Sequence, residues 1–146
     1  MKIHYRLIGQ NIMVVDKYFK IYLKNSLKEY DLNTAEGMVL LALYGHDGRT
    51  ENQILHDIHQ DYDGTSQDQL IDELHYDKSV MTRTMQALEK KGYVIRGDNP
   101  KDSRSFIFNL TSKALDFKDI LIDILKEWSD TLLTSYVTLH FYLNNL

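Results

Sequence analysis

The sequence predicts a mainly α-helical fold with one small β-hairpin, an α+β class. Apolar residues recur at helical spacing over residues 5–30 and again from residue 111 onward. Two runs rich in β-branched and aromatic residues, 93–97 and 105–110, enclose a polar turn that holds the only proline. Shorter helical segments lie between these regions, and residues 77–92 carry the clearest start and end signals.

Length and composition indicate one domain, or a compact domain with helical arms. The chain has 146 residues, so it can bury a core without a disulfide or a metal. It has no cysteine, which excludes thiol catalysis and cysteine-based zinc sites. No apolar run approaches the roughly 18 residues of a spanning helix, and the first residues lack a signal-peptide pattern. We therefore expect a cytoplasmic protein without membrane contact.

Charge is distributed unevenly along the chain. The formal net charge is −4, which alone argues weakly against a nucleic-acid partner. Residues 78–104 nevertheless carry seven Lys or Arg against three carboxylates, a net charge of +4. Residues 47–77 carry one Arg against nine carboxylates, a net charge of −8. The acidic total therefore comes from one segment, and the segment that follows it is basic.

The helix predicted at 77–92 has two chemically different faces. Asp77 suits the N-cap, where its carboxylate could accept from backbone amides, and Gly92 suits a left-handed C-terminal cap. The apolar positions should face a core: Met81, Met85 (or Thr84) and Leu88. The other face carries donors and no carboxylate: Lys78, Ser79, Thr82, Arg83, Gln86 and Lys90. Such a face could meet phosphates and base edges in a DNA major groove.

A shorter helix is predicted directly before it, at 66–74. Residues 50–58 share its polar start and apolar end, so both segments could be the first helix of a helix-turn-helix. Only Leu74 leaves a turn of about three to four residues before Asp77, as this motif requires. Residues 49–64 are therefore assigned to an acidic insertion.

The remaining helices are predicted around this motif. Asn33 and Glu36 form an N-cap signal for a buried helix that ends at Gly45 or Gly48. The N-terminal helix carries one apolar stripe: Ile8, Ile12, Val15, Phe19, Tyr22 and Leu23 or Leu27. Because this long helix has little domain of its own to cover it, we expect it to pack against another chain. The C-terminal stretch follows one apolar face, with a break into two helices expected near 133–136.

This order of elements is that of a winged helix-turn-helix between two helical arms, and it resembles the MarR family of bacterial transcription regulators over about residues 5–140. The resemblance is most specific in two motifs. The first is Gln67-x-x-Leu70-x-x-x-Leu74-x-x-Asp77-Lys78-Ser79-x-x-Thr82-Arg83, followed by Leu88-Glu89-Lys90-Lys91-Gly92-Tyr93-Val94. The second is Asp102-x-Arg104 followed by Leu110-Thr111. Residues 49–64 have no counterpart in typical members, and Met81 stands where a smaller residue is usual.

The resemblance implies a DNA-binding regulator rather than an enzyme. It implies a winged helix-turn-helix DNA-binding domain at 32–111 and a dimerisation region formed by 1–31 and 112–146. The homodimer would place one recognition helix in each of two major grooves of double-stranded DNA, with the wings at adjacent minor grooves. We expect a pseudo-palindromic operator with half-sites about 10 bp apart, and a repressor.

Site residues follow from the same resemblance. The expected DNA contacts are Lys78, Ser79, Thr82, Arg83, Gln86, Lys101, Asp102 and Arg104. Arg104 would enter or flank the minor groove, and Asp102 would hold Arg104 and the wing in place. A pocket for a small aromatic or anionic effector is expected to be lined by Tyr18, Tyr22, Met38, Tyr44, Phe117 and Trp128. The aromatic members of this set are also typical of a core or a dimer seam.

Two alternatives stay open at this point. His56 and His59 are three residues apart in the insertion and could bind a metal if a third ligand joined them. No such ligand is fixed nearby, so we expect no metal and no cofactor. The acidic insertion would repel phosphate if it faced DNA, so the chain could instead be a winged-helix protein that binds a protein partner and has weak or lost DNA binding.

Overall fold

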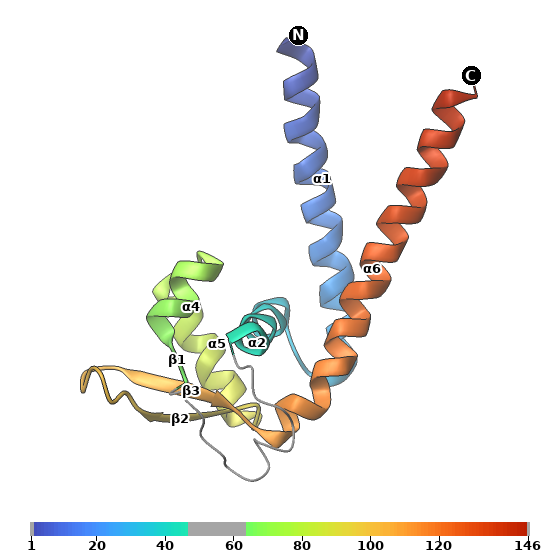
Figure 1. Cartoon of the computed structure of the whole chain (residues 1–146). Coiled ribbons are helices and arrows are strands. Elements are labelled where there is room, and N and C mark those ends of the chain that lie inside the picture. The colour runs from blue at the N-terminus through green and yellow to red at the C-terminus, as the bar shows by residue number, and fades with distance from the viewer. Residues whose placement is uncertain (1, 47–63, 146) are drawn as a thin grey trace. The chain divides into compact units, whose positions relative to one another are not determined.

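A computed structural model describes residues 2–46 and 64–145, and its fold is mainly α-helical with one small sheet, as predicted (Figure 1). The helices and strands are α1 (Lys2–Leu27), the 3-10 helix η1 (Lys28–Tyr30), α2 (Thr34–His46), β1 (Thr65–Ser66), α4 (Gln67–Leu74), α5 (Lys78–Lys90), β2 (Val94–Asp98), β3 (Phe106–Leu110) and α6 (Ser112–Asn144). The chain divides into two compact units, one of Met1–Thr34 with Ile122–Leu146 and one of Ala35–Leu121.

The sheet of the second unit has the strand order β1-β3-β2, and all its pairs are antiparallel. The hairpin pairs Val94 with Leu110 and Asp98 with Phe106, which confirms the two predicted strands. The third strand, β1, was not predicted from the sequence. It pairs Thr65 with Phe108, and α4 follows it directly. Helices α4 and α5 lie over one face of this sheet (Figure 1).

The start of α4 is fixed by a reciprocal pair of hydrogen bonds. The Gln69 amide donates to Ser66 Oγ over 3.2 Å, and the Ser66 amide donates to Gln69 Oε1 over 2.8 Å. This capping box satisfies two amides that the helix itself cannot. The helix ends at Leu74, and α5 begins at Lys78. The short turn required for a helix-turn-helix is therefore confirmed.

Helix α5 is amphipathic in the predicted way. Met81 and Leu88 are fully buried and Met85 nearly so, and Thr84 is buried as well, so the core face includes both alternatives. At the C-terminal end Gly92 has φ +80, its amide donates to Glu89 O (3.0 Å), and the Tyr93 amide donates to Leu88 O (2.9 Å). These two bonds form the Schellman end predicted from the glycine.

Asp77 occupies the N-cap position of α5, but its side chain makes no capping hydrogen bond. The predicted position is confirmed, and the predicted carboxylate bond is wrong. Asp77 has the extended backbone that an N-cap needs, with φ −61 and ψ 146, and its carbonyl accepts from the Met81 amide over 2.9 Å. The backbone alone therefore starts the helix.

An ion pair between a buried carboxylate and a half-buried lysine joins α2 to the end of α5. Helix α2 begins at Thr34, directly after the predicted cap Asn33. Glu36, in the first turn, is 3% exposed at its side chain, and its Oε2 accepts from Lys91 Nζ over 2.8 Å. The carboxylate lies at the positive end of the α2 dipole, and the ammonium lies at the negative end of the α5 dipole. Each charge is therefore stabilised both by its ion-pair partner and by a helix dipole.

The rest of this unit's core is apolar and includes the start of α6. Ala114, Phe117 and Leu121 are buried there. The Tyr93 and Phe117 rings meet edge to face, with centroids 5.8 Å apart. Other buried apolar residues of the unit are Val39, Leu40, Ala42, Leu43, Tyr44, Leu70, Val94, Phe108 and Leu110.

The first unit is built from α1, η1 and the C-terminal part of α6. The Trp128 ring lies against Phe19 and Tyr22, with centroid distances of 5.6 and 5.3 Å. Tyr22 also donates its hydroxyl to Ile124 O over 2.8 Å. Leu23, Leu27 and Leu32 are buried within the monomer, whereas several other apolar residues of α1 are exposed.

The predicted break near 133–136 is wrong, because α6 is one helix of 33 residues. Hydroxyl-bearing side chains in this part of α6 donate to carbonyls one turn earlier. Thr131 Oγ1 donates to Glu127 O and Ser135 Oγ to Thr131 O, both over 2.9 Å. These bonds keep the polar side chains compatible with a continuous helix.

The predicted insertion lies almost entirely outside the described residues, but the chain on either side of it is bonded together. His46 Nδ1 is 3.2 Å from Thr65 Oγ1, and His46 Nε2 is 2.5 Å from Glu73 Oε2. His46 thereby links the end of α2 to β1 and α4. Among the described residues, no helix is long and apolar enough to cross a membrane.

The Schellman end of α5 gives a stability prediction. Gly92→Ala should lower the free energy of unfolding by roughly 1–2 kcal/mol, because a Cβ is strained in the left-handed region. The nearest atom to a Cβ there is Lys113 Cδ at 3.8 Å, so a steric clash adds nothing. Urea denaturation measures the difference. Gly45→Ala is the matched control, since a Cβ at that helical glycine meets nothing within 4 Å and should not destabilise the protein. Equal effects of both changes would contradict this account.

Candidate nucleic-acid interface

The outward face of α5 presents most of the predicted contact residues to solvent. Lys78, Ser79, Arg83 and Gln86 are exposed, and Thr82 is half-buried. This outward face is accessible to a ligand because the opposite face of α5 packs into the core. Its exposed donors are those that phosphates and base edges require.

Two of these residues already make hydrogen bonds. Thr82 Oγ1 accepts from Gln67 Nε2 over 2.8 Å and donates to Lys78 O over 2.8 Å. Arg83 Nε lies 3.4 Å from Ser79 O, a bond that uses one of the five donors of the guanidinium. Gln67, the first residue of α4, was identified from the sequence only as part of a family motif and was not expected to touch this face.

The wing tip is a network of short-range hydrogen bonds. Asp102 Oδ1 accepts from the Arg104 amide over 3.0 Å and from Arg104 Nε over 3.3 Å. Asn99 Oδ1 accepts from the Lys101 amide over 2.9 Å, and Asn99 Nδ2 donates to Ser105 Oγ over 2.9 Å. The expected contact between Asp102 and Arg104 is therefore present. The Arg104 side chain is 90% exposed, so its charge remains available.

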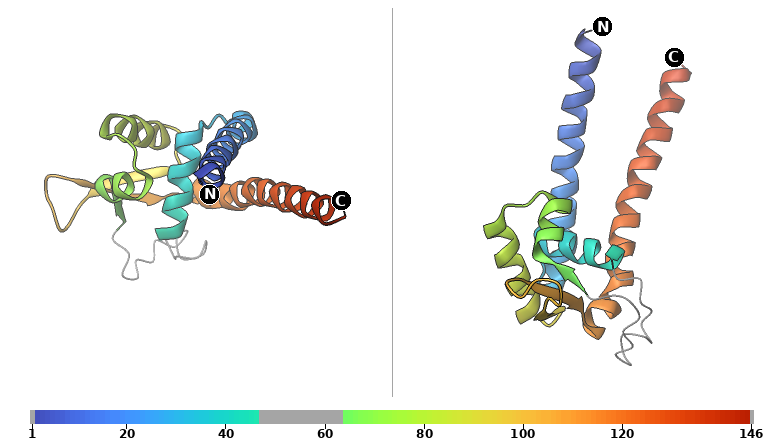
Figure 2. Two further views of the ribbon diagram at one scale, coloured as in Figure 1. Left: turned by 90° about the horizontal axis from the view of Figure 1, so that it is seen from above. Right: turned by 60° about the vertical axis from the view of Figure 1, so that its left-hand side comes forward.

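The hairpin extends beyond the helices of its unit, as both Figure 1 and the left view of Figure 2 show. Its stem is braced by Arg96, whose guanidinium lies 4.7 Å above the centre of the Phe106 ring. Arg96 Nε is also 3.7 Å from Glu89 Oε1 of α5. These contacts, which the sequence did not predict, connect the wing to α5.

A cleft of about 270 Å³ joins α4, α5 and the wing. It is lined by Gln67, Asp68, Lys78, Arg104, Ser105, Phe106 and Phe108. Lys78 from the start of α5 and Arg104 from the wing therefore share one recess. The structure brings these two predicted cations together, although 26 positions separate them in the sequence.

The six residues expected to line a ligand pocket divide between the two units. Tyr18 is 56% exposed, whereas Tyr22 and Trp128 pack on each other in the same unit. Burial is the main cause of a raised pKa at Tyr22.

In the other unit Tyr44 donates its hydroxyl to Ala114 O, and burial raises its pKa well above the ordinary value. Its hydroxyl is therefore already bonded. Met38 is half-buried, and Phe117 is buried against Tyr93. None of the six predicted residues lines either of the two clefts described here, so the effector pocket stays a prediction.

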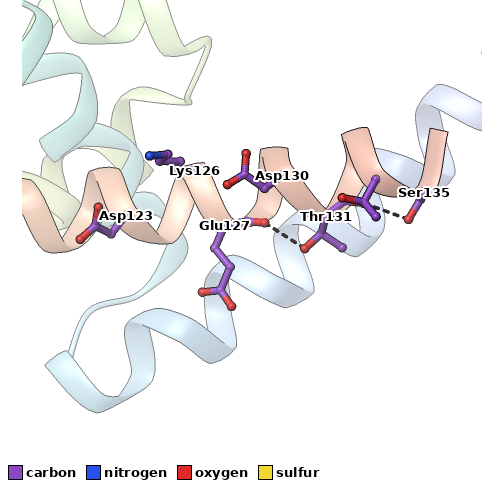
Figure 3. Close-up of a pocket in the computed structure, with 7 residues that line it drawn as sticks. Asp123, Lys126, Glu127, Asp130, Thr131 and Ser135 are labelled. Atoms are coloured by element: carbon purple, nitrogen blue, oxygen red, sulfur yellow. Dashed lines mark hydrogen bonds between the residues drawn. The ribbon is translucent and has the colours of Figure 1, made fainter. Parts of the chain in front are cut away.

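Figure 3 shows the second cleft, a polar recess of about 570 Å³ along α6. It is lined by Asp123, Lys126, Glu127, Asp130, Thr131, Thr134 and Ser135. Four charged groups and three hydroxyl-bearing residues make it a solvated helix surface rather than an apolar pocket. The candidate metal ligands His56 and His59 lie outside the described residues. Within residues 2–46 and 64–145, no three His, Asp or Glu side chains are grouped as a metal site.

Comparison with known proteins identifies the family. The model of the MarR family matches residues 30–105, just over half of the chain and the whole of the helix-turn-helix with most of the wing. The chain belongs to the MarR family. Members of this family are transcriptional regulators, and the chain is accordingly a regulator and not an enzyme.

Individual known proteins agree with this assignment. The chain is 27% identical over 128 residues to the HTH-type transcriptional regulator BilQ of Clostridioides difficile (strain CD3), covering 88% of this chain and 76% of BilQ. It is 26% identical to a MarR transcriptional regulator of Methanosarcina mazei Go1 whose crystal structure superposes with a TM-score of 0.74, covering 96% of each chain. The fold of S. aureus MepR, solved as a DNA complex, is also similar, with a TM-score of 0.70, 18% identity and coverage of 94% and 97%.

The wing network gives a second prediction. Asp102→Ala should speed hydrogen exchange of the Arg104 amide by about tenfold or more, because a hydrogen bond to a carboxylate contributes about 1.5–3 kcal/mol. Exchange measured by NMR reports this amide directly. Asp98→Ala removes a carboxylate from an exposed position on β2 and serves as the control. Unchanged exchange at Arg104 in Asp102→Ala would show that the carboxylate does not hold the wing.

Proposed function

We propose that this MarR-family regulator is a cytoplasmic homodimer that binds a pseudo-palindromic site in double-stranded DNA and represses transcription. The observation that carries the proposal is the cleft shared by Lys78 and Arg104. It joins the outward face of α5 to the wing, so Lys78 and Arg104 lie on one continuous surface, which Asp68 also lines. In this proposal α5 enters the major groove and the wing reaches the backbone and minor groove beside it.

Individual roles follow from chemistry and exposure. Arg83 and Gln86 are exposed donors in the middle of the helix face and would meet base edges. Lys78, Ser79 and Lys101 would meet phosphates, and Arg104 would approach the minor groove. Asp102 would act indirectly, by holding Arg104 through the two bonds to its Oδ1.

The exposed apolar surface of the first unit supports the homodimer. Ile12, Met13 and Val14 of α1 are 64, 72 and 50% exposed, and Leu133 of α6 is 62% exposed. A monomeric protein rarely leaves so many apolar side chains along two helices in water. A second copy of the same chain would cover them and would form the dimerisation region proposed for residues 1–31 and 112–146.

An effector that modulates DNA binding is part of the proposal. A small aromatic or anionic compound would bind near the aromatic residues Tyr18, Tyr22, Tyr44, Phe117 and Trp128 and near Met38. Tryptophan fluorescence offers a direct assay, since Trp128 is the only tryptophan.

Binding to duplex DNA at two salt concentrations tests the proposed function. The wild-type protein should shift the duplex upstream of its own gene, with log K falling by about 0.9 per contacted phosphate per log unit of salt. Arg83→Ala should lose roughly 1–3 kcal/mol of affinity for that duplex if Arg83 makes a bidentate base contact. Lys118→Ala, which removes a cation from α6, is the matched control and should bind as the wild type does.

Two results would contradict parts of this proposal. Unchanged affinity in Arg83→Ala would remove Arg83 from the interface. Absence of wild-type binding to any duplex at low salt would instead favour a winged-helix protein that binds a protein partner.

The dimer prediction is independent of DNA. Light scattering should give twice the chain mass of 17.2 kDa for the wild type. Ile12→Asp and Leu133→Asp should shift the protein toward monomer, because each would bury an unpaired carboxylate. Asn11→Asp adds the same charge beside Ile12 without removing an apolar group, and it should remain dimeric. A monomeric wild type at micromolar concentration would refute the dimer.

A further inference from the structure

The geometry points to a specific role for Thr82: we infer that its hydroxyl recognises one base and acts only as a hydrogen-bond acceptor. In this inference the Thr82 hydroxyl accepts a hydrogen bond from the amino group of adenine or cytosine and does not bind phosphate. Gln67 is the positioning residue that sets this polarity. The inference rests on the proposed DNA binding and adds to it the chemistry of one contact.

The hydrogen-bond capacity of Thr82 carries the argument. A hydroxyl has one proton to donate and two lone pairs that accept. The proton is committed to Lys78 O, 2.8 Å away within α5. One lone pair accepts from Gln67 Nε2, also 2.8 Å away. The hydroxyl therefore has a single lone pair left for a ligand on the outward face of the helix.

The remaining lone pair decides which DNA groups can bind. Phosphate oxygens have no proton to offer, so they cannot bond to this hydroxyl while the Lys78 bond persists. In the major groove the donors are the amino groups N6 of adenine and N4 of cytosine, whereas N7, O6 and O4 are acceptors. A hydroxyl that can only accept can bind these amino groups, and it cannot bind N7, O6 or O4. The sequence alone suggested contact with either bases or phosphates.

Gln67 maintains this arrangement from a different helix. Its amide nitrogen can only donate, so Thr82 Oγ1 must present a lone pair toward α4 and direct its proton elsewhere. Gln67 is the first residue of α4, where the capping box of Ser66 and Gln69 fixes the backbone. The donor is thus held in place before DNA arrives, and Thr82 needs no rearrangement on binding.

Three variants separate this role from a structural one. Thr82→Val keeps the shape and removes the hydroxyl. Gln67→Met removes the donor and keeps the length of the side chain. Thr84→Val is the matched control, because Thr84 Oγ1 donates to Val80 O over 2.8 Å in the same way but on the buried face of α5.

The probes are a duplex selected by the wild type from a randomised library and an unselected random duplex. Thr82→Val should lose roughly three- to tenfold affinity for the selected duplex, with unchanged affinity for random duplex and an unchanged salt slope. Its loss should vanish when one amino group is removed from the selected duplex, by purine in place of adenine or 2-pyrimidinone in place of cytosine. Thr84→Val should bind both duplexes as the wild type does.

The variant Gln67→Met tests whether Gln67 orients the Thr82 hydroxyl. Gln67→Met should relax base preference at the position that Thr82→Val relaxes, and the double variant should relax it no further. A uniform loss on all duplexes in Gln67→Met would leave Gln67 a structural role only and overturn its part of the inference.

Other outcomes would overturn the role of Thr82. If Thr82→Val weakens random duplex equally and lowers the salt slope, the hydroxyl binds phosphate. If its loss vanishes with a 7-deazapurine instead, the hydroxyl donates to N7. Unchanged affinity of Thr82→Val for the selected duplex would exclude any contact. Failure of the wild type to select any duplex would overturn the proposed function together with this inference.

Discussion

The orientation of α5 depends on how its C-terminal end is held. Four bonds meet within three residues there: Glu36 binds Lys91 Nζ, Lys113 Nζ donates to Lys91 O, Thr111 Oγ1 donates to Gly92 O, and the Tyr93 amide donates to Leu88 O. These bonds tie α5 to α2 and to the start of α6. Because the C-terminal end of α5 is fixed and its core face is buried, the orientation of its outward face within this unit is fixed as well.

The elements that could be predicted are those specified by nearby residues. The polar start at Ser66 indicates α4, Gly92 ends α5, and two β-branched and aromatic runs around a proline-containing turn indicate the hairpin. Each signal involves groups a few positions apart, so a single sequence contains all the necessary information. The exposure of Lys78 and Arg83 follows in the same way, because the opposite face of α5 is the apolar one.

The features that could not be predicted depend on distant pairs. Strand β1 exists because Thr65 meets Phe108, and Glu36 finds Lys91 across 55 positions. Likewise, Gln67 reaches Thr82 only after two helices have packed. The expected break in α6 is absent, and the Thr131 and Ser135 hydroxyls near it bond to carbonyls of the preceding turn. The residues proposed to bind an effector are far apart in the sequence, and no local pattern specifies such a site.

The bonds of His46 have a consequence for the stability of the helix-turn-helix. His46 Nδ1 is 3.2 Å from Thr65 Oγ1, and Glu73 of α4 binds the other nitrogen of the same imidazole. One side chain thereby joins the end of α2 to β1 and to α4. Because the two contacts share this imidazole, their contributions to the free energy of unfolding should not be additive.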